Sequence, residues 1–149
     1  MNARLRLMGW GVLALASAMV QAQESPDAAA LVVHEAWIRT APPTAPVRAG
    51  YGVIENSGRR EVVIDAVRSD AFGAIEIHEM REVDGVMRMR RLPSLTLEPG
   101  RSVSLEPGGM HLMLFRAMGP LEAGARVSIG FFAREVEVAR AEFVVRETP

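Results

Sequence analysis

The feature that most constrains the fold of this chain is a repeated alternation of apolar and polar residues in short segments. From His34 onward these segments follow a period of two, which is typical of β-strands whose side chains point in turn to opposite faces. Pro and Gly residues separate the segments at intervals of about ten residues. After the N-terminal region, no stretch of ten or more residues keeps the 3.6-residue period of a helix. The pattern therefore predicts an all-β sandwich or barrel of short, mostly antiparallel strands.

The alternation and the turn residues between segments place ten strands. In chain order they cover residues 34–39, 49–56, 62–68, 74–80, 86–90, 95–97, 102–105, 111–115, 127–132 and 136–145. The sharpest turn signal is Asp84-Gly85, because this pair suits the two-residue turn of a tight hairpin.

Length, charge and cysteine content narrow the class of protein. With 149 residues, the chain is sized for one domain. Its formal net charge of -1 lacks the excess of positive charge that is typical of nucleic-acid-binding proteins. It contains no Cys, which excludes disulfides, thiolate zinc sites, iron–sulfur clusters and thiol nucleophiles.

The first 22 residues have the pattern of a secretory signal. Arg4 and Arg6 precede an apolar run over residues 7–20, and Val20-Gln21-Ala22 offers small residues for cleavage. The alternative is a transmembrane anchor, but the run is shorter than the ~20 residues that span a bilayer. We expect a cleaved signal peptide (1–22), a linker (23–33) and one domain (34–149). The mature protein would then be periplasmic and would have no membrane anchor. We also expect no lipid anchor, because no Cys follows the apolar run.

Methionine and histidine are concentrated in one part of the sequence. Six of the nine Met residues, together with two of the three His residues, lie between residues 78 and 118. Since residues i and i+2 of a strand share a face, three pairs stand out. These pairs are His78 with Met80, Met87 with Met89, and His111 with Met113. The first two pairs flank the Asp84-Gly85 turn, so one hairpin would bring them together.

This combination of side chains favours copper(I). Thioether sulfur is a soft, neutral ligand that suits copper(I) and has little affinity for zinc, magnesium or calcium. Imidazole binds copper in either oxidation state. A set of two His and two Met disfavours copper(II), which prefers nitrogen and oxygen donors in a tetragonal arrangement.

The spacing of these residues resembles the signature of the PCu(A)C family of periplasmic copper chaperones. That signature is His, ten residues, Met, twenty-one residues, and then His-x-Met. His78, Met89, His111 and Met113 stand at these spacings. The similarity also covers Trp37-Ile-Arg39, Tyr51-Gly-Val-Ile-Glu-Asn56 and Pro107-Gly-Gly-Met-His-Leu-Met-Leu114, and so most of residues 34–145.

The resemblance implies the metal ligands, the fold and the partners. His78, Met89, His111 and Met113 would bind one copper(I) ion at a solvent-accessible site on a cupredoxin-like β-sandwich. The family is associated with assembly of the copper centres of cytochrome c oxidase, so subunit II of the oxidase or a thioredoxin-like copper chaperone would be the partner. Two features depart from the family. Glu79 occupies the position of an optional Met, and the chain ends without the His- and Met-rich tail of some members.

Structural roles compete with ligation at each of these residues. A lone His is more often a hydrogen-bonded structural residue, and a lone Met more often fills a core. We expect Met110 and Met118 to be core residues, His34 to be structural, and Trp37 and Tyr51 to support the fold. Whether Met80 or Met87 joins the site stays open.

Four functions are compatible with the sequence to different degrees. The leading one is a copper(I) carrier that supplies the oxidase, and the alternative is a periplasmic copper buffer or tolerance protein without a dedicated acceptor. An enzyme is disfavoured, since the donor set disfavours redox cycling and no catalytic triad or paired-carboxylate motif is readable. Glu76, Glu79 and Glu82 are better explained as outward hairpin residues. A metal-free β-sandwich that uses its Met residues for protein contacts is the fourth.

Overall fold

The computed structural model describes residues 31–147, which form eleven β-strands and no helix. The strands are β1 (Leu31–Arg39), β2 (Val47–Asn56), β3 (Val62–Ile64), β4 (Ala66–Arg68), β5 (Phe72–Val83), β6 (Val86–Leu92), β7 (Leu95–Leu97), β8 (Ser102–Leu105), β9 (Met110–Ala117), β10 (Arg126–Ala133) and β11 (Val136–Arg146).

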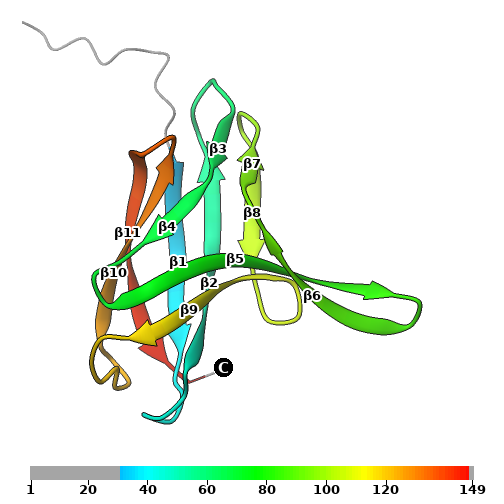
Figure 1. The fold of residues 1–149 in the computed structure, drawn as a ribbon. Coiled ribbons are helices and arrows are strands. Elements are labelled where there is room, and N and C mark those ends of the chain that lie inside the picture. The colour runs from blue at the N-terminus through cyan, green and yellow to red at the C-terminus, as the bar shows by residue number, and fades with distance from the viewer. Residues whose placement is uncertain (1–30, 148–149) are drawn as a thin grey trace, which may run out of the picture.

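The main sheet has nine strands and closes on itself. Its order is β1-β11-β10-β4-β5-β9-β2-β8, with β6 added to β5, and β1 also pairs with β2. Strands β1 and β11 are parallel, and the other pairs are antiparallel. Figure 1 shows β5 and β9 crossing the strands β1, β2, β10 and β11 as a second layer. Strands β3 and β7 make a separate two-stranded sheet.

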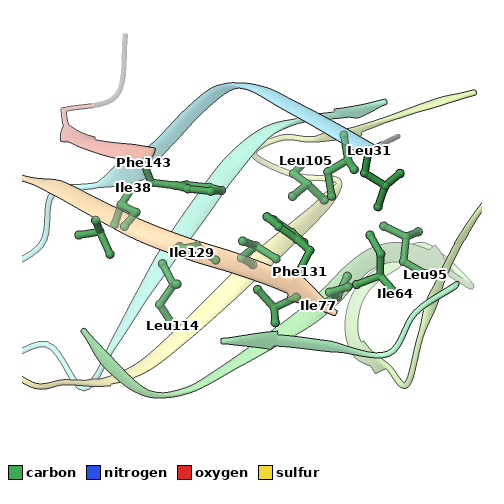
Figure 2. Packing of buried hydrophobic residues seen from close by; sticks show 14 of the residues in the cluster. Leu31, Ile38, Ile64, Ile77, Leu95, Leu105, Leu114, Ile129, Phe131 and Phe143 are labelled. Atoms are coloured by element: carbon green, nitrogen blue, oxygen red, sulfur yellow. The ribbon is translucent and has the colours of Figure 1, made fainter. Parts of the chain in front are cut away.

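The core fills the space between the two layers, where alternate residues of each strand point inward (Figure 2). Ile38, Leu114, Ile129, Phe131 and Phe143 are fully buried there. Burial of each such side chain stabilises the fold by roughly 1.5–3 kcal/mol. With no Cys in the chain, this burial has to stabilise the fold without disulfides.

The predicted all-β class is confirmed, and every predicted strand is present. Three details differ. Strand β1 begins at Leu31, so residues 31–33 belong to the sheet and the predicted linker 23–33 is wrong at its C-terminal end. The segment predicted as one strand over 62–68 divides at Asp65 into β3 and β4, which belong to different sheets. Strands β5 and β11 have 12 and 11 residues, longer than predicted.

Part of the N-terminal prediction lies outside the described residues. This holds for the signal peptide over 1–22 and for the linker up to residue 30. Within residues 31–147, no helix is long and apolar enough to cross a membrane.

The last part of β5 and most of β6 form a hairpin that projects from the body of the molecule (Figure 1). We call residues 79–91 the hairpin arm. Val83 pairs with Val86 across the turn, and both turn residues have positive φ, 53° at Asp84 and 76° at Gly85. This geometry is that of a two-residue hairpin turn with left-handed central residues, and it confirms the Asp84-Gly85 prediction. Among the strands of residues 31–147, β6 pairs only with β5, and the arm is solvated along most of its length.

Candidate metal centre

Three neighbouring strands bring the predicted ligand residues to one region of the sheet. The register pairs His78 of β5 with His111 of β9, and Met80 of β5 with Met89 of β6. Met113 lies opposite Glu76, two residues before His78. Directly opposite residues share a face, as do residues i and i+2, so all of these side chains lie on one face of β5, β6 and β9.

A pocket of about 380 Å³ lies where the hairpin arm, the start of β9 and the adjoining ends of β1 and β2 meet. Its lining comprises Arg39, Thr40, Ala41, Val47, Arg48, Ala49, Tyr51, Met80, Met89, Gly108, His111 and Met113. Three of the four predicted ligands therefore share one pocket. His78 is not part of the lining, although its ring centroid is 6.1 Å from that of His111. Met80 is part of it.

His111 is held with one ring nitrogen available. The side chain is buried, and Nδ1 lies 3.1 Å from the carbonyl oxygen of Gly109, in the turn that precedes β9. Since a carbonyl can only accept, Nδ1 carries the proton and the lone pair is on Nε2. A hydrogen bond of this kind fixes the tautomer and the orientation of a metal-binding imidazole.

His78 is held differently. Its Nε2 lies 2.8 Å from the Glu76 carboxylate, so Nε2 donates and the lone pair is on Nδ1. Nδ1 is buried and has no hydrogen-bond partner in the described part of the chain. Arg91 contacts the other oxygen of Glu76 at 3.5 Å. A metal could reach His78 through the unpartnered Nδ1, or through Nε2 once the contact with Glu76 breaks.

The methionines differ in exposure and in position. Met80 and Met113 are half-buried, whereas Met89 is 50% exposed. Met87 is equally exposed but lies farther along the hairpin arm, outside the pocket lining. Met110 packs against the core as predicted. The prediction that Met118 is a core residue is wrong: it follows the last residue of β9 and is 73% exposed.

Two aromatic residues lie beside the pocket, since Tyr51 belongs to its lining and Trp37 packs against Tyr51. Trp37 and Tyr51 are buried, with ring centroids 4.6 Å apart, and the Tyr51 ring is 6.5 Å from that of His111. Their predicted role in the fold is confirmed. His34 lies on β1, is exposed and is outside the pocket lining.

Three residues that the structure places at the site do not stand out in the sequence as site residues. Glu76, expected to be an outward hairpin residue, hydrogen-bonds His78 from the same face. Its position two residues before His78 is the signal that could have found it. Arg39 and Arg48 line the pocket through pairing of β1 with β2, and no local pattern indicates this.

The family model of the LpqE-like proteins, described as "Putative lipoprotein LpqE-like", matches residues 31–145, nearly the whole described part of the chain. This chain belongs to the LpqE-like family. It is 30% identical over 98 residues to "Putative lipoprotein Lxx21020" of Leifsonia xyli, covering 65% of this chain and 58% of the relative. It is 31% identical over 114 residues to the uncharacterized protein RP573 of Rickettsia prowazekii, covering 72% and 61%. The LpqE-like chain thus spans about three fifths of the length of these relatives.

Solved structures with the same fold include PCuAC domains. The apo PCuAC domain from PmoF1 matches with a TM-score of 0.65 and 21% identity, over 82% of this chain and 98% of that one. The copper-bound PCuAC domain from PmoF2 gives 0.64 and 18%, over 79% and 93%. The copper(I) form of DR1885 from Deinococcus radiodurans gives 0.57 and 22%, over 85% and 82%. At these identities the likeness establishes the fold, and the predicted cupredoxin-like fold of PCu(A)C domains is confirmed for this LpqE-like protein.

Proposed function

We propose that this LpqE-like protein is a copper(I) carrier that binds one ion through His78, Met89, His111 and Met113. The observation that carries the proposal is the strand register, which puts two imidazoles directly opposite each other and two thioethers on the same face. Copper-bound structures of proteins with the same fold support it. The match to the four-residue spacing supports it independently of the fold.

The donor set suits copper(I) as cargo. Two thioethers and two neutral imidazoles add no charge, so the ion keeps its single positive charge, and only the imidazoles compete with protons. The half-exposed Met89 lies on the hairpin arm, where an acceptor can reach it. If ligands of the acceptor replace the thioethers one at a time, the ion can be transferred without being released as free copper.

His78 and Met80 compete for the fourth position. His78 completes the spacing, but in the metal-free arrangement Glu76 engages its Nε2. Met80 lies opposite Met89 and lines the pocket. We assign the position to His78, because a second imidazole binds copper(I) without the three-thioether crowding that Met80 would create. Met80 then lies at the rim of the pocket.

The proposed place of action is outside the cytoplasm, and the proposed role is supply rather than catalysis. The signal-like sequence over residues 1–22 and the lipoprotein description of the family both support export. The resemblance to PCu(A)C proteins favours delivery to copper centres of cytochrome c oxidase, directly to subunit II or through a thioredoxin-like chaperone. A copper buffer without a dedicated acceptor is the second candidate, favoured by the mixed, exchangeable donors.

Two experiments test the carrier function. The protein without residues 1–22 is titrated with copper(I) in competition with a chromogenic copper(I) chelator, and we expect one equivalent to be retained. Failure to compete would remove the proposal. The loaded protein is then mixed with the copper-free soluble domain of oxidase subunit II. Transfer supports the carrier, whereas retention of copper would favour the buffer.

A further inference from the structure

Strand β6 leaves one edge of the main sheet open. Among the strands of residues 31–147 it pairs only with β5, and six of its seven residues are exposed. An open edge presents a row of backbone N–H and C=O groups that can pair with another strand. The other strand at an end of the main sheet, β8, has only four residues and no charged side chain.

A hydrogen bond of β5 shows which backbone groups of β6 face the open edge. The amide of Met80 donates to the carbonyl oxygen of Gly109, the residue before β9, at 3.2 Å and so points away from β6. Met80 and Met89 are therefore a non-hydrogen-bonded pair of the antiparallel ladder, and the N–H and C=O of Met89 point outward. Because this orientation alternates along a strand, the backbone groups of Met87 and Arg91 point outward as well.

The side chains of β6 divide between two faces with the same alternation. Met89 lines the pocket, and Met87 shares its face, which we call the pocket face. Arg88 and Arg90 point to the opposite face, and their backbone groups bond to β5. A strand added at the open edge would place alternate side chains beside the two methionines and the others beside the two arginines.

The face of the arm opposite the pocket face has an excess of positive charge. Arg90 lies opposite Glu79 and forms an ion pair with it at 3.0 Å. Arg88, however, lies directly opposite Arg81 of β5. Like charges at directly opposite positions destabilise a pair of strands. An acidic side chain on an adjacent strand would lower the repulsion between these two arginines.

We infer that the open edge of β6 binds an extended acidic segment of another protein by strand addition. The backbone groups of Met87, Met89 and Arg91 supply the hydrogen bonds, and acidic residues at every second position of the segment face Arg88 and Arg90. The charge of β6 disfavours a second copy of the same chain as the partner, because β6 contains three arginines and no acidic residue.

Strand addition has a consequence for metal transfer that rests on the proposed function. The residues between the acidic positions of the segment would lie on the pocket face, beside Met89. Directly opposite side chains of paired strands have β-carbons about 5 Å apart. A methionine or histidine of the acceptor at such a position could therefore replace Met89 as a copper(I) ligand while the two proteins stay bound.

The test uses the metal-free protein and a blocked peptide, acetyl-Thr-Glu-Val-Glu-Val-Glu-Thr-amide. Amide hydrogen exchange is followed by ¹⁵N-edited NMR as the peptide is added. We expect the amides of Met87, Met89 and Arg91 to exchange about fivefold more slowly or less, since they gain hydrogen bonds. The amides of Arg88 and Arg90, already bonded to β5, should change little. A control peptide with lysine in place of each glutamate should have no effect.

A pair of variants tests the backbone contact. Met87→Pro removes one outward N–H, and proline is tolerated on an edge strand where that N–H faces solvent. We expect peptide binding to weaken about fivefold or more, because one hydrogen bond is lost. Met87→Leu keeps the N–H and is the matched control, with binding expected within about twofold of the original.

Protection of the Arg88 and Arg90 amides shows whether the arm stays folded in Met87→Pro. If it does not, peptides with every second amide N-methylated replace the variant, and of the two possible phases one must bind and the other fail. Equal binding of the lysine peptide, protection spread evenly along β6, or no response to the acidic peptide would overturn the inference. None of these outcomes depends on copper(I) affinity, so failure here is distinguishable from failure of the proposed function.

Discussion

At the scale of single residues, the two histidines are prepared for a metal in different ways. The hydrogen bond from His111 to Gly109 leaves Nε2 as the only free nitrogen. The Glu76 carboxylate holds His78, which must give up that contact to coordinate through Nε2. We expect His111 to be the fixed ligand and His78 the ligand that adjusts when the metal binds.

The thioether ligands can be tested without loss of core volume. Met89→Leu and Met113→Leu each keep size and apolarity, so we expect the free energy of unfolding to change by less than ~1.5 kcal/mol. Copper(I) affinity should fall by about tenfold or more in each variant, because leucine has no donor atom. Met87→Leu is the control, since Met87 is as exposed as Met89 but lies outside the pocket lining. Chelator competition measures all three. Unchanged copper(I) affinity in Met89→Leu would show that Met89 is not a ligand.

A second comparison decides between His78 and Met80. We expect His78→Ala to weaken copper(I) binding strongly and Met80→Leu to weaken it less than Met89→Leu. The physical reason is that Met80 contributes to the pocket wall, whereas His78 supplies a nitrogen. Both affinities come from the same chelator competition. If His78→Ala binds copper(I) normally and Met80→Leu loses binding, then Met80 rather than His78 is the fourth ligand.

At this scale the residue types and their shared face were predictable from the sequence. The period of two places Met80, Met89 and Met113 correctly, because it depends only on strand geometry. It could not show that Glu76 engages His78, since rotamers and hydrogen bonds depend on neighbours from other strands. The prediction for Met118 failed because β9 ends one residue earlier, and the side chain emerges into solvent.

At the scale of elements, the hairpin arm positions Met80 and Met89 opposite each other. Its turn was predictable, since Asp-Gly is a local signal for φ above zero at both central residues. The extension of β5 from Met80 to Val83 was not predicted, because the adjacent charged residues Arg81 and Glu82 break the alternation. The division of residues 62–68 was not predictable, because at Asp65 the chain passes from one sheet to the other. The Asp65 carboxylate there accepts a hydrogen bond from the amide of the distant Arg134.

The arm depends on glycine at one turn position. Gly85 has a φ of 76°. Apart from its chain neighbours, no described residue has an atom within 4 Å of the point where a β-carbon would stand, so Gly85→Ala tests backbone strain alone. We expect a cost of roughly 1 kcal/mol. Amide hydrogen exchange over β6 should therefore accelerate about fivefold, since the arm can open without the rest of the sheet. Gly119→Ala, at a glycine with equally open surroundings and no such φ, should leave exchange in β6 unchanged. Equal rates in the two variants would show that the turn does not limit the stability of the arm.

At the scale of the whole molecule, the main sheet is closed and needs no disulfide. The exposed hairpin arm extends from this sheet and contributes two of the methionines that line the pocket. Closure needs β1 to pair with β2 on one side and with β11, near the other end of the described chain, on the other. The all-β class follows from local alternation. The closure of the sheet does not follow from this alternation, because it depends on long-range strand pairing that no local pattern encodes.

The stability of the closed sheet should depend on the interior aromatic residues. Phe131 is fully buried beside Phe143, with ring centroids 6.5 Å apart. We expect Phe131→Ala to lower the free energy of unfolding by about 3–5 kcal/mol, measured by urea denaturation. Val136→Ala, at a side chain that is 64% exposed, should cost less than about 1 kcal/mol. Similar costs for both would contradict the core described above.

The most direct test of the copper site is X-ray absorption at the copper edge of protein loaded with one equivalent of copper(I). We predict a reduced copper ion with both sulfur and nitrogen scatterers in its shell, and loss of sulfur scattering when Met89 and Met113 are both replaced by leucine. A shell of nitrogen and oxygen alone, or sulfur scattering that survives the double replacement, would contradict the assignment.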